Sequence, residues 1–134
     1  MKPCIPMYVA MHGKQADDAD AVARWEVQVR KGVLELAILA SLWSEKLYGL
    51  EILRRLADVS GLVVTEGTVY PLLARLKAEG WLDAEWVEAE AGHPRKYYRL
   101  TARGRRHALR LARSWSSFAA GVDRLLAPLR KEDR

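Results

Sequence analysis

The spacing of apolar residues along the chain predicts a mainly helical protein with one β-hairpin. Apolar positions recur every three or four residues within 17–30, 49–60 and 65–80, which is the period of a helix that buries one face. The segment 33–43 is apolar on nearly every side, too long for one strand and rich in helix formers, which predicts a buried central helix. The segments 81–88 and 95–100 alternate instead between apolar and polar residues, as half-buried strands do. A last helical pattern follows Thr101, a good helix cap. The predicted fold class is therefore α+β, mainly α with a small β-hairpin.

These elements are expected to form one domain with a helix added at each end. The 134 residues are enough for one hydrophobic core but not for two independent domains. We predict a flexible N-terminal tail over residues 1–16, an extra N-terminal amphipathic helix over 17–30, a domain of three helices and the hairpin over 31–100, and a long C-terminal helix over 101–134. Nothing in this order is left over for a catalytic domain.

The composition favours a binding protein over an enzyme. The chain has 22 basic and 17 acidic residues, a net charge of +5 that suits a polyanionic partner and equally an ordinary basic surface. The single cysteine and three scattered histidines exclude a disulfide framework and a zinc-ligand pattern, so we expect no metal or cofactor. The serines have no histidine and acid partners in the pattern. No apolar run reaches the length of a membrane span, and we expect a cytoplasmic location.

The helix predicted over 65–80 has a small, smooth outer face. Its apolar side is formed by Val69, Leu72, Leu73 and Leu76. The opposite side carries small residues between one tyrosine and one arginine, namely Gly67, Pro71, Ala74 and Ala78 between Tyr70 and Arg75. A helix in the major groove must bring its backbone close to the base edges, which small residues permit. The candidate DNA-binding residues of this helix are Thr65, Gly67, Thr68, Tyr70, Pro71 and Arg75. Alternatively, Tyr70 packs on a neighbouring helix and Arg75 is simply solvated.

Pro71 limits where this helix can begin. A proline inside a helix loses one backbone hydrogen bond and clashes with the carbonyl four residues before it, at a cost of about 3 kcal/mol. Two arrangements avoid much of this cost. Either the helix begins near Thr68, which puts Pro71 in the first turn, or it kinks over Gly67.

The turn of the hairpin is basic. The segment Gly92–Lys96 contains turn-forming residues, the titratable imidazole of His93 and the cations Arg95 and Lys96, and Arg99 follows along the strand. Such a turn is suited to phosphate contact or to insertion into the minor groove. We add His93, Arg95, Lys96 and Arg99 to the DNA-binding candidates, while noting that basic residues on exposed turns are often only solvated.

The long C-terminal helix carries an apolar stripe that a single chain has no obvious way to cover. Its members are spaced alternately by three and four residues: Ala108, Leu111, Trp115, Phe118, Val122, Leu125 and Leu129. A repeat of 3.5 residues over this length predicts a partner helix, and hence a homodimer. Val22, Trp25 and Val29 of the N-terminal helix would join this interface. Alternatively, Trp25, Trp43, Trp115 and Phe118 line a cavity for a planar aromatic effector.

Four motifs resemble the PadR family of bacterial transcriptional regulators. They occur in order along the chain, from residue 31 to about residue 107: KGVLEL at 31–36, LYG at 47–49, EGTVYPLLARL at 66–76 and PRKYYRLT at 94–101. Tyr48 of the second motif is added to the DNA-binding candidates. The motifs do not extend to residues 1 to about 28.

The resemblance implies a winged helix-turn-helix fold that acts as a dimer. Its third helix is expected in the major groove, its wing against the backbone or minor groove, and its last helix at the dimer interface. The family typically represses transcription from inverted repeats and often releases DNA on binding a small molecule. A different class of function is kept open, a winged-helix protein-interaction module that reads no bases.

Overall fold

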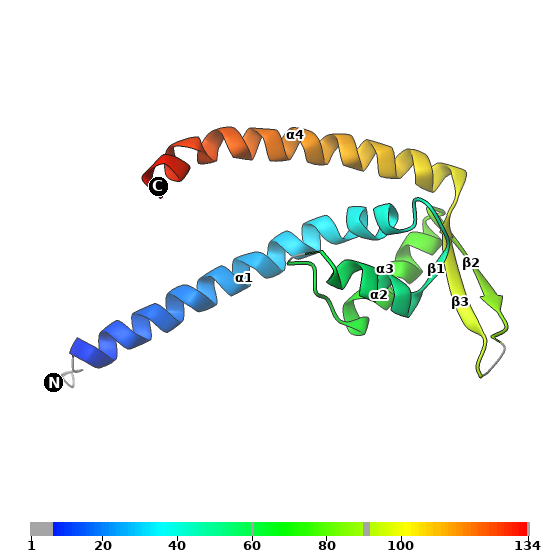
Figure 1. Cartoon of the computed structure of the whole chain (residues 1–134), viewed down its shortest axis with the longest axis horizontal. Coiled ribbons are helices and arrows are strands. Elements are labelled where there is room, and N and C mark those ends of the chain that lie inside the picture. The colour runs from blue at the N-terminus through cyan, green and yellow to red at the C-terminus, as the bar shows by residue number, and fades with distance from the viewer. Residues whose placement is uncertain (1–6, 60, 90–91, 134) are drawn as a thin grey trace. The chain divides into compact units, whose positions relative to one another are not determined.

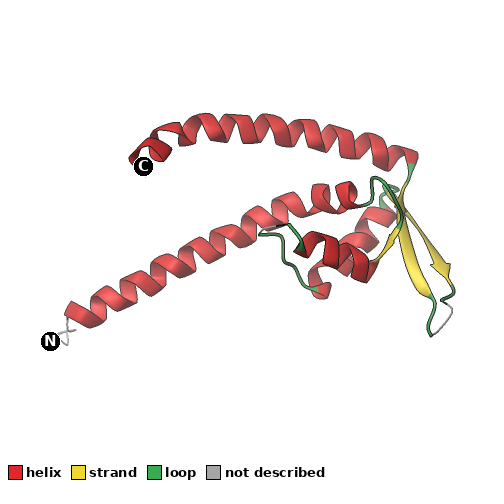
Figure 2. Ribbon diagram, in the orientation of Figure 1, coloured by secondary structure: helices red, strands yellow, loops and turns green. Residues whose placement is uncertain are grey.

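The computed structural model describes residues 7–59, 61–89 and 92–133, with side chains from residue 17 onward. The elements are α1 (Met7–Ser41), β1 (Leu47–Tyr48), α2 (Gly49–Ala57), α3 (Glu66–Ala78), β2 (Leu82–Val87), β3 (Arg95–Leu100) and α4 (Ala102–Glu132) (Figure 1). Helices predominate and the strands form one small sheet (Figure 2). The chain divides into an N-terminal unit that ends at Leu34 and a main unit that begins at Glu35. None of the described helices is long and apolar enough to cross a membrane.

The N-terminal region corrects the sequence prediction. Residues 7–16, predicted as a flexible tail, are helical, and the two helices predicted over 17–30 and 33–43 are one continuous helix, α1. Residues 1–6 of the predicted tail lie outside the described residues. The physical reason is that no proline occurs between Pro6 and Pro71, and Gly32 inside a helix costs only about 1 kcal/mol relative to alanine. A single glycine weakens a long helix without ending it.

The core of the main unit is built from one face of each helix and the inner face of the sheet. Ile38 and Leu39 at the end of α1, Ile52 in α2, and Leu73 in α3 have no exposed surface. The other buried apolar residues are Leu42, Leu47, Leu56, Val69, Leu76, Leu82, Tyr98 and Ala108. Of the apolar side predicted for the 65–80 helix, Val69, Leu73 and Leu76 are confirmed as core, while Leu72 is only half-buried.

The sheet has three antiparallel strands in the order β1-β3-β2. The predicted hairpin is β2 and β3, which pair from Leu82 opposite Leu100 to Val87 opposite Arg95. The third strand, β1, was not predicted, because it consists of only two residues and exists through its pairing with β3. This pairing joins the start of α2 to the hairpin.

Helix α3 excludes one of the two arrangements considered for Pro71. The helix begins at Glu66, so Pro71 is its sixth residue, and a start near Thr68 is wrong. The carbonyl four residues before the proline belongs to Gly67, which has no Cβ to restrict how the chain adjusts there. At the other end, Gly80 adopts φ +86° and its N–H donates to the Lys77 carbonyl. Gly80 thus ends α3 as the sequence predicted.

A compact joint connects the sheet to α4. The Thr101 hydroxyl accepts from the Gly104 N–H at 2.9 Å, which confirms Thr101 as the cap of α4, and donates to the Gly80 carbonyl at 2.7 Å. Gly104 lies so close to the Trp81 carbonyl that a Cβ there would overlap it. The start of α4 is therefore held against the end of α3 and the start of β2.

Candidate nucleic-acid interface

The outer face of α3 is exposed, as the sequence predicted. Gly67, Pro71, Ala74 and Ala78 are all open to solvent on the side opposite the buried Leu73. Thr65 and Thr68 are exposed at the N-terminal end of the helix, where their hydroxyl oxygens lie 3.3 Å apart. With no long side chain along its centre, this face allows close approach of another surface to the α3 backbone.

Tyr70 lies at one edge of this face and contacts the start of α2. Its ring is so close to Gly49 that a Cβ at that position would overlap it. The side chain is 40% exposed, so it packs on α2 and still presents part of its surface to solvent. The packing alternative considered from the sequence is therefore confirmed, and the exposed part of the ring stays open to a partner.

Arg75 lies at the other edge of α3 and is already ion-paired. Its guanidinium donates to the Glu79 carboxylate at 2.7 Å and lies 3.5 Å from the Glu35 carboxylate of α1. His107 of α4 approaches Glu35 at 3.3 Å and stacks on Trp81, with ring centroids 4.0 Å apart. These partners link α3 to α1 and α4, and the sequence did not reveal them.

This network shifts the titration of its charged groups. The hydrogen bond from Arg75, and then that from the Trp81 indole, lower the pKa of Glu79 below its ordinary value. The same carboxylate, with Glu35 adding to it, raises the pKa of Arg75. Arg75 is therefore a permanently charged group on an exposed edge of α3, with two intramolecular partners.

The wing consists of β2, β3 and the turn between them, of which residues 90–91 are not described. His93 and Arg95 are exposed, and the Arg95 guanidinium lies 4.6 Å from the centre of the Tyr48 ring. Lys96 is half-buried, with its ammonium 5.6 Å from the centre of the Tyr98 ring. Because side chains alternate along a strand, Arg95 and Arg99 lie on one face of β3 and Lys96 on the other. Tyr48, Tyr70, Arg95 and Lys96 nevertheless all border one pocket, and Arg99 does not.

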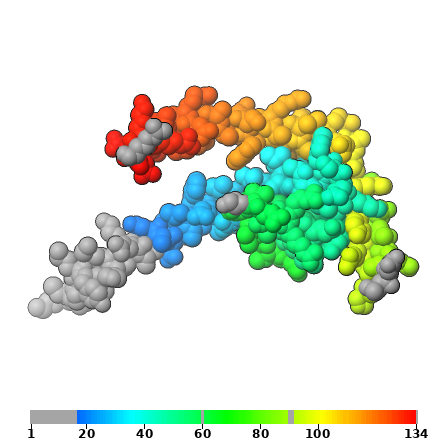
Figure 3. All heavy atoms as spheres, in the orientation of Figure 1, coloured from blue at the N-terminus to red at the C-terminus, as the bar shows by residue number. Residues whose placement is uncertain are grey.

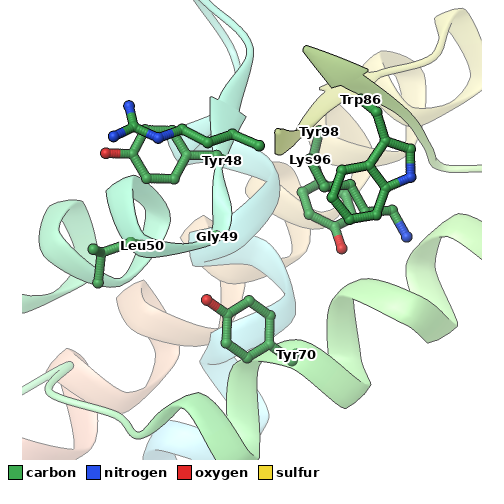
Figure 4. A pocket seen from close by; sticks show the side chains of 8 residues that line it. Tyr48, Gly49, Leu50, Tyr70, Trp86, Lys96 and Tyr98 are labelled. Carbon is green, nitrogen blue, oxygen red and sulfur yellow. The ribbon is translucent and has the colours of Figure 1, made fainter. Parts of the chain in front are cut away.

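A pocket of about 300 Å³ lies where α2, α3 and the wing meet (Figure 4). The residues that line it come from all three elements and from β1: Tyr48, Gly49, Leu50, Tyr70, Trp86, Arg95, Lys96 and Tyr98. Four of these, Gly49, Leu50, Trp86 and Tyr98, were not among the sequence candidates. The available signal was the cross-strand register, which places Trp86 opposite Lys96, but it requires knowledge of the hairpin pairing.

The apolar stripe on α4 is uncovered in the single chain. Ala108 is buried and Leu111 half-buried, but from Trp115 onward the stripe is exposed, with Phe118 at 71% and Leu125 at 78%. The exposed members of the stripe are Trp115, Phe118, Val122, Leu125 and Leu129. The C-terminal part of α4 extends beyond the body formed by α2, α3 and the sheet (Figure 3). These side chains are therefore available to a partner.

Of the four aromatic residues considered for an effector cavity, the three in the main unit lie at two separate places. Trp43 lies under Arg105 at the start of α4, with the guanidinium 4.2 Å from its ring. Trp115 is ten residues further along, about 15 Å at the rise of a helix. Trp25 belongs to the N-terminal unit, where it is exposed. Within the described residues of the main unit, Trp115 and Phe118 share a surface, the stripe on α4.

Comparison with known proteins gives a consistent result. The sequence profile described as "Transcriptional regulator PadR-like family" matches residues 38–110. A PadR-like transcription factor from Bacteroides fragilis is 41% identical, with a TM-score of 0.63 over 76% of this chain and 98% of its own. A PadR family regulator from Eggerthella lenta is 34% identical and has a TM-score of 0.74, and the match covers 84% of this chain and 97% of the regulator. A PadR-like transcriptional regulator from Bacillus cereus is also 34% identical and has a TM-score of 0.68, and the match covers 75% of this chain and 97% of the regulator.

The network around Arg75 predicts a pH-dependent effect of Glu79→Gln on stability. A carboxylate whose pKa is lowered by folding stabilises the folded state above its ordinary pKa, and this stabilisation is lost as pH falls through the lowered value. We expect Glu79→Gln to lower the melting temperature at pH 7 by at most about a few degrees, because the pair is exposed. The difference from the wild type should shrink as the pH falls below the ordinary glutamate pKa and disappear once Glu79 is protonated in the folded state. Circular dichroism melts across this range provide the measurement.

Glu88→Gln serves as the control, since Glu88 is exposed, lies outside the helices and has no ion pair among the described residues. A loss for Glu79→Gln that is equal at pH 7 and in acid would contradict the assigned role of the carboxylate.

Proposed function

The chain belongs to the PadR-like family of transcriptional regulators, and we propose that it represses transcription as a homodimer bound to an inverted-repeat operator. Family membership makes it a DNA-binding regulator and not an enzyme. The mode of binding, the dimer and the direction of regulation are our proposals.

The proposal is carried by one observation, that Tyr70 at the edge of the small outer face of α3 lines the same pocket as Arg95 and Lys96 of the wing. Helix α3 would enter the major groove with Gly67, Pro71 and Ala74 toward the bases, because only small residues let the backbone approach base edges. Arg95 and Lys96 would contact the sugar-phosphate backbone beside it. Thr65, Thr68 and Tyr70 would supply hydroxyl contacts at the edge of the helix.

The exposed stripe on α4 supports the homodimer. An apolar surface of this length is unfavourable in water, and pairing with a second copy buries it at about 1.5 to 3 kcal/mol per large side chain, less the cost of association. A dimer with two-fold symmetry presents two copies of α3 in opposite directions. The matching DNA is an inverted repeat with half-sites about one helical turn apart or a multiple of it.

Substitutions at the interface should separate base reading from phosphate contact. We expect Arg75→Ala to cost about 1–3 kcal/mol on the cognate sequence and less on scrambled DNA, if its guanidinium leaves Glu79 to read a base. Arg95→Ala and Lys96→Ala should weaken binding to the cognate and the scrambled duplex alike. Each should reduce the slope of log affinity against log salt concentration by about one. The measurement is fluorescence anisotropy with a duplex from the region upstream of the protein's own gene, at several salt concentrations.

Lys131→Ala is the control, because Lys131 is exposed in the last turn of α4. Equal loss for Arg75→Ala on both sequences would limit Arg75 to holding α3 through Glu79 and Glu35. No binding by the wild type to either duplex would instead favour the protein-interaction module.

A charge in the α4 stripe should dissociate the dimer. We expect Leu125→Glu to yield monomers at micromolar concentration, since burying an unpaired carboxylate at the interface is strongly unfavourable. Ala127→Glu introduces the same charge on the exposed opposite side of α4 and should leave the dimer intact. Sedimentation equilibrium reports the mass of each. A wild type that is monomeric, or a dimeric Leu125→Glu, would argue against α4 pairing.

We also propose that a small planar aromatic effector acts at the α4 interface. Trp115 and Phe118 are exposed on the same stripe, and their flat faces suit stacking of such a molecule between two protomers. We expect the dye anilinonaphthalenesulfonate to quench tryptophan emission and to lower DNA affinity in the wild type but not in Trp115→Ala. Unchanged DNA affinity in the presence of the dye would favour the alternative, that these aromatic residues only fill the dimer interface.

A further inference from the structure

The positive charge of the chain is concentrated on the first half of α4. Residues 102–122 contain five arginines and no lysine or acidic residue, while the rest of the chain has 17 basic and 17 acidic residues. Residues 65–100, which include α3 and the wing, contain five basic and six acidic residues. The net charge that would attract a polyanion therefore lies on α4 and not on α3 and the wing.

Two of the five arginines are used within the fold. Arg103 donates to the Glu79 carbonyl at 3.3 Å, and its guanidinium lies 4.6 Å from the centre of the Trp81 ring. Arg105 donates to the Trp43 carbonyl at 3.0 Å and lies over the ring of the same residue. Both side chains therefore help to hold the start of α4 on the main unit.

The other three arginines, Arg106, Arg110 and Arg113, form a surface that we call the arginine stripe. They are spaced by four and three residues, so they share one side of the helix, and all three are exposed. Across the described part of the chain, none of them has an ion pair or a side-chain hydrogen bond. The arginine stripe faces away from the buried Ala108 and is available to a partner.

The surroundings of the arginine stripe fit a nucleic acid better than a protein. Protein interfaces have an apolar centre with aromatic anchors, whereas interfaces with DNA are polar and strongly basic. Leu109 borders the arginine stripe on one side, and a depression of about 390 Å³ lies at its C-terminal end, lined by Arg113, Ser114, Ser117 and Phe118. The guanidinium and the two hydroxyls are groups of the kind that donate to phosphate oxygens in DNA complexes.

The length of the arginine stripe also suits a DNA strand. From Arg106 to Arg113 the helix rises about 10 Å. One strand of a duplex has a negative charge about every 3.4 Å along the axis. Three guanidinium groups thus extend over about the same length as three phosphates.

The arginine stripe and the outer face of α3 lie on different sides of the main unit. Each faces away from the buried residues of its own helix, Ala108 in α4 and Leu73 in α3. In Figures 1 and 3 the first half of α4 runs along the upper side of the main unit, and α2 and α3 lie below it. A straight duplex contacted by the outer face of α3 would therefore not reach the arginine stripe.

We propose that the arginine stripe binds the sugar-phosphate backbone of a second DNA segment, so that the protein holds two duplexes at once. The inference rests on the proposed function and adds to it a second surface that does not read sequence. The outer face of α3 reads the operator, and the arginine stripe captures DNA further along the same molecule or on another one. Helix α4 then uses its apolar side for pairing and its basic side for this capture.

Capture of a second duplex tests the arginine stripe. A biotinylated duplex from the region upstream of the protein's own gene is fixed on streptavidin beads, loaded with protein and washed. A fluorescein-labelled duplex of random sequence is then added at several salt concentrations, and we expect the wild type to retain it at low salt. The stripe variant combines Arg106→Gln, Arg110→Gln and Arg113→Gln. It should retain the labelled duplex about tenfold more weakly or worse, with a slope of log affinity against log salt concentration that is smaller by about three.

The fixed duplex provides the internal reference. Its affinity for the stripe variant, measured by fluorescence anisotropy, should stay within about threefold of the wild type, because its contacts come from α3 and the wing. The matched control variant combines Arg24→Gln, Lys31→Gln and Lys131→Gln, which remove the same charge at exposed positions outside the arginine stripe, α3 and the wing. We expect it to capture the labelled duplex as the wild type does. Circular dichroism melts establish that both variants are folded.

The outcomes are distinct. If the wild type binds the fixed duplex but captures no second one, or if both triple variants capture it equally, the inference is refuted while the DNA-binding function stands. If the stripe variant loses the fixed duplex by the same factor, the arginines contact the duplex that α3 reads, and the second segment is refuted. If the wild type binds neither duplex, both proposals are refuted. Labelled polyglutamate that binds the wild type, without capture of a second duplex, would assign the arginine stripe to an acidic protein and overturn the assignment to DNA.

Discussion

Burial of one side of α3 is the constraint on which the rest of the surface depends. Val69, Leu73 and Leu76 have no exposed area, and each is held by the core that α1, α2 and the sheet complete. Because residues three and four apart share a face of a helix, fixing these three positions also fixes the rotation of α3 about its axis. The row of small residues that begins at Gly67 must then face outward. The outward face is thus a consequence of the core and not an independent feature.

The central strand β3 gives the interface its second part. This strand carries Lys96 and Tyr98. It pairs with β2, the other strand of the wing, on one side and with β1, which leads into α2, on the other. The pocket exists because these two pairings meet beside Tyr70 of α3. Arg75 at the opposite edge of α3 pairs with Glu79 at the end of the same helix and with Glu35 of α1, which His107 of α4 also approaches. Both edges of α3 are therefore held by other parts of the main unit.

The long helix α4 has a different relation to the core. Its first turn is held by Thr101 and by the close approach of Gly104 to the Trp81 carbonyl, and its first buried apolar side chain is Ala108. From Trp115 onward its apolar stripe is exposed in the single chain. Since α4 is anchored to the same joint that ends α3, a partner bound along α4 would be placed in a defined position relative to the recognition helix. Our proposal of a two-fold symmetric dimer uses this connection.

The amino-acid sequence by itself determined the features that depend on neighbouring residues. Helical period, caps such as Thr101, stops such as Gly80 and the alternation along β2 and β3 act over one or two turns, so they could be predicted without a structure. The small outer face of α3 and the basic wing followed from the same patterns. Only the tertiary structure decided the continuity of α1, the two-residue strand β1, the ion pairs of Arg75 and the position of Tyr98. Strand β1, the ion pairs of Arg75 and the position of Tyr98 depend on residues far apart in the chain. The continuity of α1 could not be predicted because one glycine, Gly32, costs too little to end a helix.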